Sequence, residues 1–437
     1  MKIACGRRAA LIVVAVLLLA AALAGCRSDA GSAKDPVPSS SSGDVRVAST
    51  DGTPADTAPA DTAPADTAPP VRPWVPRPIV VAPDPKVVRA KLAADAARAA
   101  AARSDSLRAD SARSLTAAAD TRSARSDPAR PDSARTDSAR TGARRSSRKP
   151  TPAVARVGQR RYALTPADSA RWPVRGPEPL PGALLPEHLL VAYYGNPKST
   201  RMGVLGQLPP AEMLAGLERT ATEWARAEPG RKVMPALHVI VTVAQGLPGP
   251  GGKYRLRHSD QTIERVLGWA EERGWIVFLD VQTGHSSVAD ELPHLVKYLE
   301  RPYVHLALDP EFAMTNGGIP GRRIGTLDAA DVNQAVEVLA RIVEQRRLPP
   351  KVLVVHRFTQ RMLTNHARIK LDPRVQIVID MDGFGAPAFK EDAYKFFIVP
   401  EPVQFTGFKL FFKNDKPMMT PQQVLGLWPS PVYIQYQ

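Results

Sequence analysis

The chain has 437 residues and a formal net charge of +15 at pH 7, but this charge is unevenly distributed. Residues 86–175 hold 21 Lys and Arg against 8 Asp, whereas residues 176–437 hold 29 Lys and Arg against 27 Asp and Glu. The nearly neutral C-terminal part argues against a nucleic-acid-binding domain, which would carry a basic patch. The two cysteines, Cys5 and Cys26, lie near the N-terminus, so the C-terminal part has no disulfide and no catalytic or zinc-binding thiol.

The N-terminus has the pattern of a secretory signal. A short basic segment precedes an apolar run at residues 9–22, which is too short for a comfortable membrane span. The sequence "LAGC" at residues 23–26 resembles the lipobox of bacterial lipoproteins, in which the cysteine is acylated and becomes the new N-terminus. We therefore predict a signal peptide over residues 1–25 and a lipid anchor on Cys26, which holds the protein to the outer side of a membrane. Because Arg27 and not Asp follows, we expect outer-membrane sorting if the cell has two membranes.

Residues 26–175 have the composition of a linker. They contain the Pro/Ala/Thr repeat "DTAPADTAPADTAP" at 56–69, and then a segment rich in Ala, Arg, Asp and Ser in which "DSAR" recurs. Such sequences bury too little apolar surface to offset the entropy of ordering, which predicts a disordered tether. Two interpretations stay open: a spacer whose arginines contact anionic lipid or wall polymer, and a solubilising linker with no partner.

Residues 176–437 show the pattern of one barrel domain. Eight apolar runs, separated by amphipathic helical stretches, lie at residues 189–195, 236–244, 275–281, 303–309, 351–358, 375–382, 405–412 and 432–437. Nearly continuous apolar strands alternating with helices indicate a parallel sheet covered on both faces. We predict a single α/β (β/α)8 TIM-like barrel with its last strand at the C-terminus and no eighth helix. A doubly wound open sheet is the alternative, although no glycine-rich phosphate loop follows the first strand.

Polar side chains gather at the carboxyl ends of these strands, where barrels place their reactive groups. Three strands end in Asp-x-Gln, Asp-x-Glu and Asp-x-Asp, and residues two apart on a strand share a face. Crowded carboxylates raise one another's pKa, which keeps one of them protonated as a general acid. We expect catalytic roles for Asp280, Asp309 and Glu311, and substrate binding by Tyr193, Tyr194, Gln282, His356, Asp380, Asp382, Lys409 and Gln435.

The fourth strand ends in "LDPE" at residues 308–311, and Gln435 and Tyr436 close the eighth. Both features are similar to barrel glycoside hydrolases of the chitinase and family-25 muramidase type, a resemblance that implies Glu311 as the acid and Asp309 as its support. The chain departs from the chitinase signature, because it lacks acids at positions 304 and 307. The seventh strand ends in lysines, which excludes a pair of catalytic carboxylates of a retaining glycosidase divided between strands four and seven.

As a whole, the domain resembles an uncharacterised family of secreted bacterial barrel lipoproteins. The resemblance rests on the segments "YYGNP", "FLDVQ", "LALDPEFAM" and "VIDMDGFG", and it implies no activity.

Three functions fit these features. The first is a surface-tethered glycoside hydrolase that acts on cell-wall or extracellular polysaccharide and needs no cofactor or metal. The second is a non-catalytic carbohydrate-binding lipoprotein on a degenerate barrel. The third is a metal-dependent hydrolase, because oxygen-rich clusters suit Mg²⁺, Mn²⁺ or Ca²⁺. Its ligands would come from Asp280, Asp309, Glu311, His356, and Asp380 or Asp382.

Several of these residues also have structural interpretations. Glu311 could form a salt bridge with Lys409 or with a rim arginine, Arg322 or Arg323, and the aspartates at 380 and 382 could shape a turn. Lys409 could instead form a Schiff base. His238 and His305 lie inside strands, so we predict that both are buried structural histidines.

Overall fold

The computed structural model describes residues 74–86, 89, 93, 97 and 170–437. The predicted signal peptide, the predicted lipidation site Cys26 and most of the predicted linker lie outside these residues. None of the helices in the described part of the chain is long and apolar enough to cross a membrane.

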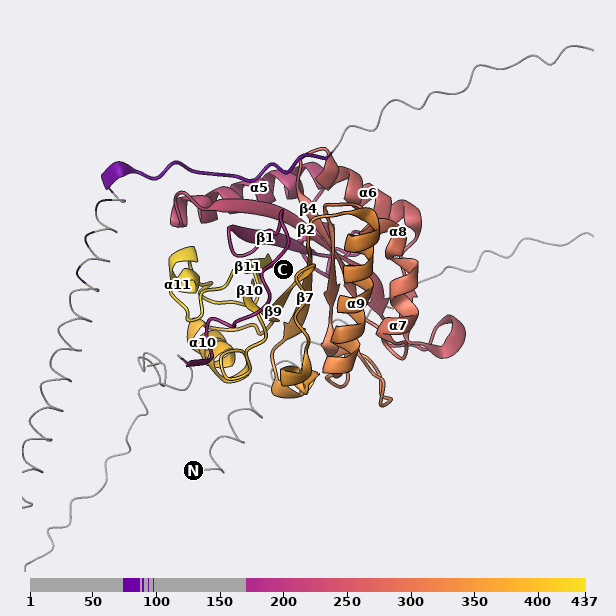
Figure 1. The fold of residues 1–437 in the computed structure, drawn as a ribbon. Helices are drawn as coiled ribbons and strands as arrows, with labels where there is room; N and C mark the ends of the chain where they lie inside the picture. The colour runs from indigo at the N-terminus through magenta and orange to yellow at the C-terminus, as the bar shows by residue number, and fades with distance from the viewer. Residues whose placement is uncertain (1–73, 87–88, 90–92, 94–96, 98–169) are drawn as a thin grey trace, which may run out of the picture.

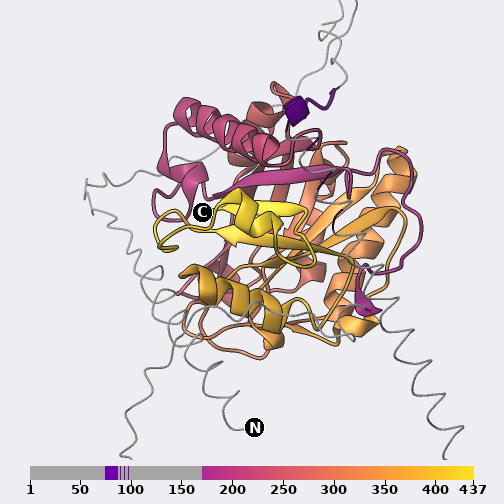
Figure 2. The same cartoon turned by 90° about the vertical axis from the view of Figure 1, so that its left-hand side faces the viewer.

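Within the described residues, eight parallel strands close into a barrel (Figures 1 and 2). The strands are β1 (His188–Gly195), β2 (Lys232–Ala244), β4 (Ile276–Val281), β5 (Val304–Leu308), β7 (Lys351–Arg357), β9 (Val375–Met381), β10 (Phe405–Leu410) and β11 (Tyr433–Tyr436). β1 pairs in parallel with both β2 and β11, and in Figure 2 the yellow C-terminal strands lie beside the magenta β1. This closure confirms the predicted TIM-like barrel and excludes the open doubly wound sheet.

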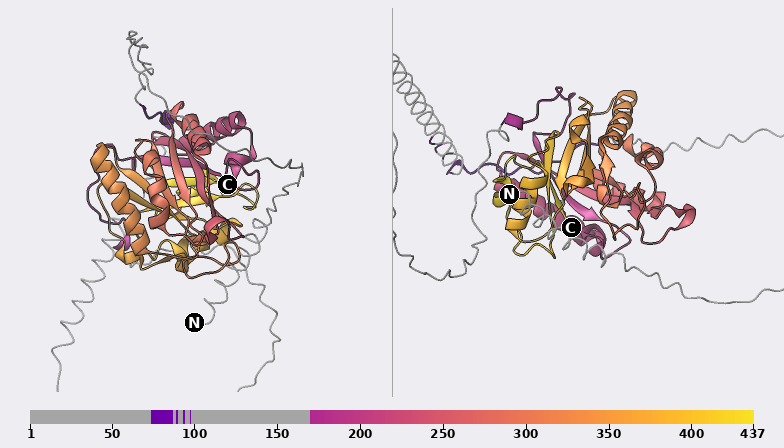
Figure 3. Two further views of the ribbon diagram at one scale, coloured as in Figure 1. Left: turned by 90° about the vertical axis from the view of Figure 1, so that its right-hand side faces the viewer. Right: turned by 90° about the horizontal axis from the view of Figure 1, so that it is seen from below.

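Helices pack around the outside of the strands (Figures 1 and 3). They are α4 (Val204–Gln207), α5 (Pro210–Ala227), α6 (Asp260–Glu271), α7 (Val288–Glu291), α8 (Val296–Leu299), α9 (Ala329–Arg346), α10 (Pro387–Phe397) and α11 (Pro421–Leu425). Local sequence sets their starts: Pro210 occupies the first turn of α5, and Asp328 and Asp331 form a capping box before α9. The buried face of α5 includes Met213 and Trp224, which pack against the barrel.

The helical pattern expected between the third and fourth strands is interrupted. Proline at position 293 removes a backbone donor, and the segment divides into α7, the 3-10 turn η2 (Leu292–His294) and α8. Residues 359–369, between the fifth and sixth predicted strands, also form no α-helix. That segment contains η4 (Gln360–Met362), β8 (Leu363–Thr364) and η5 (His366–Arg368), and β8 pairs with β6 (Leu327–Asp328). The remaining short elements are η1 (Pro250–Gly252), β3 (Arg255–Arg257) and η3 (Pro310–Phe312).

Residues 74–86 lie against the barrel, although the sequence placed them in the linker. Ile79 exchanges two backbone hydrogen bonds of 2.7 and 2.9 Å with Val233 at the start of β2. Trp74 stacks on Tyr303 with ring centroids 5.5 Å apart, and Val81 packs against the core. The apolar run "WVPRPIVV" in this segment supplies the burial that the surrounding repeats lack. Part of the predicted linker, from Trp74 to Val81, therefore contacts the barrel.

Residues just before β1 pack against the start of β9. The side chain of Gln376 accepts hydrogen bonds from the backbone N–H groups of Leu184 and Leu185, and donates one to the carbonyl of Leu185. Trp172 lies slightly further upstream, is buried, and donates a 2.9 Å hydrogen bond to the carbonyl of Val399.

Replacing Ile79 with Asp should lower the free energy of unfolding of the full chain by about 1–3 kcal/mol, because a carboxylate would meet the apolar core. Urea denaturation followed by tryptophan fluorescence measures this change. The matched control is Val80→Asp, because Val80 is 55% exposed. Equal losses in the two variants would show that residues 74–86 do not stabilise the barrel.

Candidate functional site

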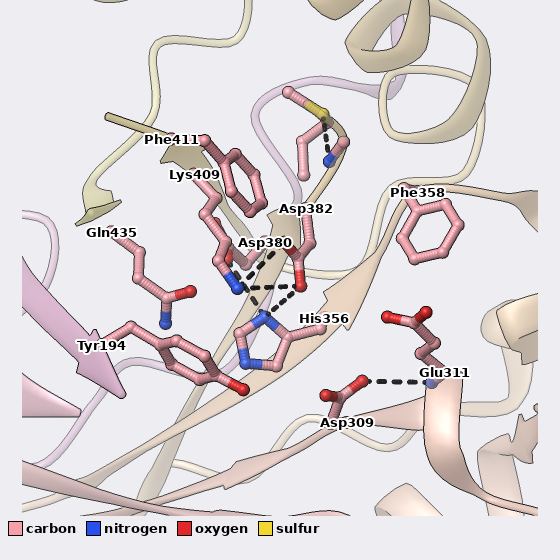
Figure 4. Close-up of polar contacts among 12 residues, drawn as sticks. Tyr194, Asp309, Glu311, His356, Phe358, Asp380, Asp382, Lys409, Phe411 and Gln435 are labelled. Carbon is pink, nitrogen blue, oxygen red and sulfur yellow. Dashed lines mark hydrogen bonds and ion pairs between the residues drawn. The ribbon is translucent and has the colours of Figure 1, made fainter. Parts of the chain in front are cut away.

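Buried polar side chains lie together inside the barrel, and Figure 4 shows several of them around His356. Five of them are fully buried and form what we call the inner cluster: His238, Asp280, His356, Asp380 and Gln435. Six lie closer to the carboxyl ends of the strands and form the mouth group: Tyr194, Gln282, Asp309, Glu311, Asp382 and Lys409. Residues two apart on a strand point to the same face, so Asp280 and Gln282 both face the barrel interior, as do Asp380 and Asp382. The first residue of each pair belongs to the inner cluster, and the second lies one layer closer to the mouth.

His356 at the end of β7 contacts three carboxylates. Its Nδ1 lies 3.3 Å from Oδ2 of Asp380 and 3.3 Å from Oδ2 of Asp382. Its Nε2 lies 3.9 Å from Oδ2 of Asp280. Burial alone would lower the pKa of His356, but these carboxylates raise it well above its ordinary value. His356 is therefore a central residue of the site.

His238 on β2 faces the same carboxylate from the other side. Its Nε2 lies 3.8 Å from Oδ2 of Asp280, and its Nδ1 lies 2.6 Å from the hydroxyl of Tyr433 and 3.0 Å from Nε2 of Gln435. Burial lowers the pKa of His238 to about 4, against the opposing effect of Asp280. The prediction that His238 is buried is confirmed, but its contact with Asp280 places it in the site.

Lys409 on β10 is paired with Asp382. Its Nζ lies 3.0 Å from Oδ1 and 3.2 Å from Oδ2 of that carboxylate, and 3.9 Å from the ring centroid of Tyr194. The ion pair and the aromatic face favour an electrostatic role for Lys409 over a Schiff base. Burial alone would raise the pKa of Asp382, but Lys409 and His356 lower it below its ordinary value. Asp382 is thus an ionised carboxylate in the mouth group.

Asp309 and Glu311 follow β5 on the 3-10 turn η3. Oδ1 of Asp309 accepts a 3.1 Å hydrogen bond from the backbone N–H of Glu311, and its Oδ2 accepts one of 3.1 Å from Gln282. The amide of Gln282 also lies 3.3 Å from the hydroxyl of Tyr194. Asp309 therefore caps the turn that follows β5. Its second oxygen continues the hydrogen bonds that link Gln282 and Tyr194 at the mouth of the barrel.

The environment raises the pKa of each acid above its ordinary value. Burial raises the pKa of Asp309 to about 7, helped by Asp280 and Asp382 and opposed by His356. Burial and the Asp309 carboxylate raise the pKa of Glu311 well above its ordinary value. Figure 4 shows both carboxyl groups turned toward His356 and Asp382. Within the described residues, Glu311 makes no ion pair with a rim arginine or lysine, so the salt-bridge alternative is not observed.

Tyr193 is not part of this site, contrary to the prediction from sequence. Its hydroxyl lies 2.8 Å from Oγ1 of Thr220 on α5, and its ring packs against Phe412 and Tyr436 outside the barrel. Adjacent strand residues point to opposite faces, so Tyr194 is inside and Tyr193 is outside. The same alternation puts Gln435 in the inner cluster and Tyr436 against the helices.

Small residues make room for the inner cluster. Ala307 on β5 is the register partner of Asp280, and Gly407 on β10 is the partner of Asp380. A Cβ atom at Gly407 would lie 2.6 Å from Oδ1 of Asp380 and 2.9 Å from Cδ1 of Tyr433. Larger side chains at these two positions would occupy the space that the carboxylates use.

A buried ion pair supports the ends of β9 and β10. Nζ of Lys390 lies 3.0 Å from Oδ2 of Asp415 and donates hydrogen bonds to the carbonyls of Gly383 and Lys409. Asp415 in turn accepts from the backbone N–H groups of Gly385 and Phe411. These bonds fix the backbone that carries Asp382 and Lys409. The sequence analysis did not identify this pair, whose two members lie 25 residues apart.

Comparison with known proteins gives little further information. No family model matches the chain, and no curated protein matches it in sequence. The crystal structure of a ruminal GH26 endo-β-1,4-mannanase resembles it weakly, with a TM-score of 0.28 and 11% sequence identity. The alignment covers 57% of this chain and 58% of the mannanase chain, so this chain spans less than two thirds of that protein. This resemblance to a TIM-barrel glycoside hydrolase assigns no residue a role, and membership of a lipoprotein family stays a prediction.

Replacing Gly407 with Ala should lower the free energy of unfolding by about 1–3 kcal/mol, because the new methyl group meets Asp380 in a filled interior. The control is Gly268→Ala on α6, where a Cβ meets nothing within 4 Å and the change should stabilise by up to about 1 kcal/mol. Chemical denaturation measures both. Unchanged stability of Gly407→Ala would contradict the tight packing around the inner cluster.

Proposed function

We propose that the chain is a lipid-anchored, extracytoplasmic glycoside hydrolase that acts on cell-wall or other extracellular polysaccharide. The observation that carries the proposal is the division of charge in the mouth group. Glu311 is held protonated, with the pKa of its neighbour Asp309 at about 7, whereas Asp382 is held ionised by Lys409. Glycoside hydrolysis needs one acid to protonate the leaving oxygen and one carboxylate to act as base, nucleophile or stabiliser.

Glu311 is the proposed general acid. Its side chain is only partly buried, whereas Asp309 is 3% exposed and its two oxygens are engaged by Glu311 N–H and Gln282. Glu311 is thus the acid that a substrate can reach, and Asp309 supports it by fixing the turn and raising its pKa. These roles agree with those that the "LDPE" resemblance implied.

Asp382 is the proposed ionised partner, in place of Asp280. The sequence analysis gave Asp280 a catalytic role, but Asp280 is fully buried within the inner cluster. Asp382 is 9% exposed and lies in the mouth group beside Lys409 and Tyr194. The amide of Gln282 donates to both Asp309 and Tyr194, and so fixes these two side chains beside the carboxylates.

Replacing Glu311 with Gln should lower the release of reducing ends from a susceptible polysaccharide by at least about 100-fold, because the amide cannot donate the proton. The full chain and the variant are incubated with purified peptidoglycan and a panel of polysaccharides, and reducing ends are counted. Glu391→Gln, on the exposed side of α10, is the matched control and should keep the activity.

Two outcomes would contradict this function. Equal release by the wild type and the Glu311→Gln variant would exclude Glu311 as the acid. No release by the wild type, with retention of the chain on an insoluble polysaccharide, would favour the carbohydrate-binding alternative.

The anchoring proposal rests on the signal pattern and the "LAGC" sequence. A Cys26→Ser variant should move from the membrane fraction to the soluble fraction and lose incorporation of radiolabelled palmitate, because the acylated thiol is absent. Cys5→Ser is the matched control, because this cysteine lies within the predicted signal peptide and should not affect labelling. Continued labelling of Cys26→Ser would contradict lipidation at this position.

A further inference from the structure

The inner cluster contains an unusual concentration of polar atoms without hydrogen-bond partners. They are Nε2 of His238, both carboxylate oxygens of Asp280, Oδ1 of Asp380, Nε2 of His356, and Oε1 of Gln435. Nδ1 of His356 and Oδ2 of Asp380 lie 3.3 Å apart as an ion pair. All five side chains are fully buried. Leaving buried polar atoms unpaired costs free energy, and native proteins pair the great majority of them. A concentration at one place indicates a site that binds a ligand.

The geometry of three of these side chains suits a single ion. One donor atom from each of His238, Asp280 and His356 lies within 4.8 Å of the others. Nε2 of His238 and Nε2 of His356 lie 3.8 and 3.9 Å from Oδ2 of Asp280. Two ligands of a tetrahedral ion with bonds of about 2.1 Å are about 3.4 Å apart. Both distances to Asp280 are within about 0.5 Å of this spacing, so small side-chain rotations would bring the three donor atoms onto one ion.

The opposite nitrogen of each imidazole has an acceptor beside it. Nδ1 of His356 lies 3.3 Å from a carboxylate oxygen of Asp380 and from one of Asp382. Nδ1 of His238 lies 3.0 Å from the amide of Gln435, and turning that amide by 180° makes its unpartnered oxygen the acceptor. Histidines that bind metals usually donate their second N–H in this way. Both Nε2 lone pairs are then free to face Asp280.

The charges of the site also favour a dication. Three buried aspartates, Asp280, Asp380 and Asp382, face one buried cation, Lys409, which pairs with Asp382. A metal ion binds neutral imidazoles, and with both histidines neutral the three aspartates and Lys409 sum to a charge of −2, which a divalent ion would neutralise. Buried charges without compensation are strongly unfavourable.

We propose that His238, Asp280 and His356 bind one divalent transition-metal ion, with Zn²⁺ the best match. Two imidazoles and one carboxylate are a ligand set that Zn²⁺ takes with an open fourth position, whereas Mg²⁺ and Ca²⁺ prefer oxygen ligands. The site goes beyond the proposed glycoside hydrolysis, which needs no metal. It also differs from the metal site expected from the sequence. That site included Asp309 and Glu311, which lie in the mouth group, and it did not include His238.

The test is zinc binding by the full chain, purified in detergent and stripped with chelator. Isothermal titration with Zn²⁺ should give one ion per chain, and Co²⁺ in its place should give the visible absorption of a site with nitrogen ligands. Loss of a residue that only hydrogen-bonds a metal ligand weakens metal binding by about 10–100-fold. His238→Gln and His356→Gln remove ligands themselves, so each should weaken Zn²⁺ binding by more than this. Gln435→Leu should weaken binding within that range.

His305→Gln is the matched control. His305 is also a buried strand histidine, but its Nδ1 accepts a hydrogen bond from the backbone of Val352 and it is not among the three ligands. This variant should bind Zn²⁺ as the wild type does, and circular dichroism checks the folding of each variant. Failure of the wild type to bind Zn²⁺ or Co²⁺ would overturn the proposal. Unchanged Zn²⁺ binding by folded His238→Gln and His356→Gln would also overturn it. Neither result depends on whether the chain hydrolyses polysaccharide.

Discussion

The architecture depends on keeping ionisable side chains inside a closed barrel. Moving charges out of water is costly, and the cost is offset only where opposite charges and hydrogen bonds surround them. Here Lys409 faces Asp382, and His356 lies among three aspartates. Gly407, a residue without a side chain, leaves space for these groups. Most other strand residues are apolar, and this group of ionisable side chains lies toward the carboxyl ends of the strands.

Charge links the two parts of the site. Asp382 contacts both His356 of the inner cluster and Lys409 of the mouth group. Asp280 contributes to the raised pKa of Asp309. An ion bound by His238, Asp280 and His356 would therefore change the field at the proposed acids without touching them. The inner cluster would act as electrostatic support for the mouth group.

The sequence predicted the barrel because parallel strands buried on both faces appear as regular apolar runs. It also predicted most of the site, because the strands end in polar residues. It could not tell which face of each strand lies inside, since closure and register set that choice. Tyr193 was therefore wrongly placed in the mouth, and His238 was taken as structural only. The segment around Ile79 was hidden within repeats of low complexity, although its own residues are apolar.

The most direct test of the account is the ionisation of Glu311 itself. Carboxyl ¹³C NMR of the full chain labelled at glutamate, with Glu311→Gln to assign the resonance, follows this group through a pH titration. Burial and the neighbouring Asp309 and Asp382 carboxylates raise the pKa of Glu311, against the opposing effects of Lys409 and His356. Glu311 should then stay protonated at neutral pH and lose its proton well above the ordinary glutamate value of about 4.3. A midpoint at that ordinary value would contradict the proposed acid and the function built on it.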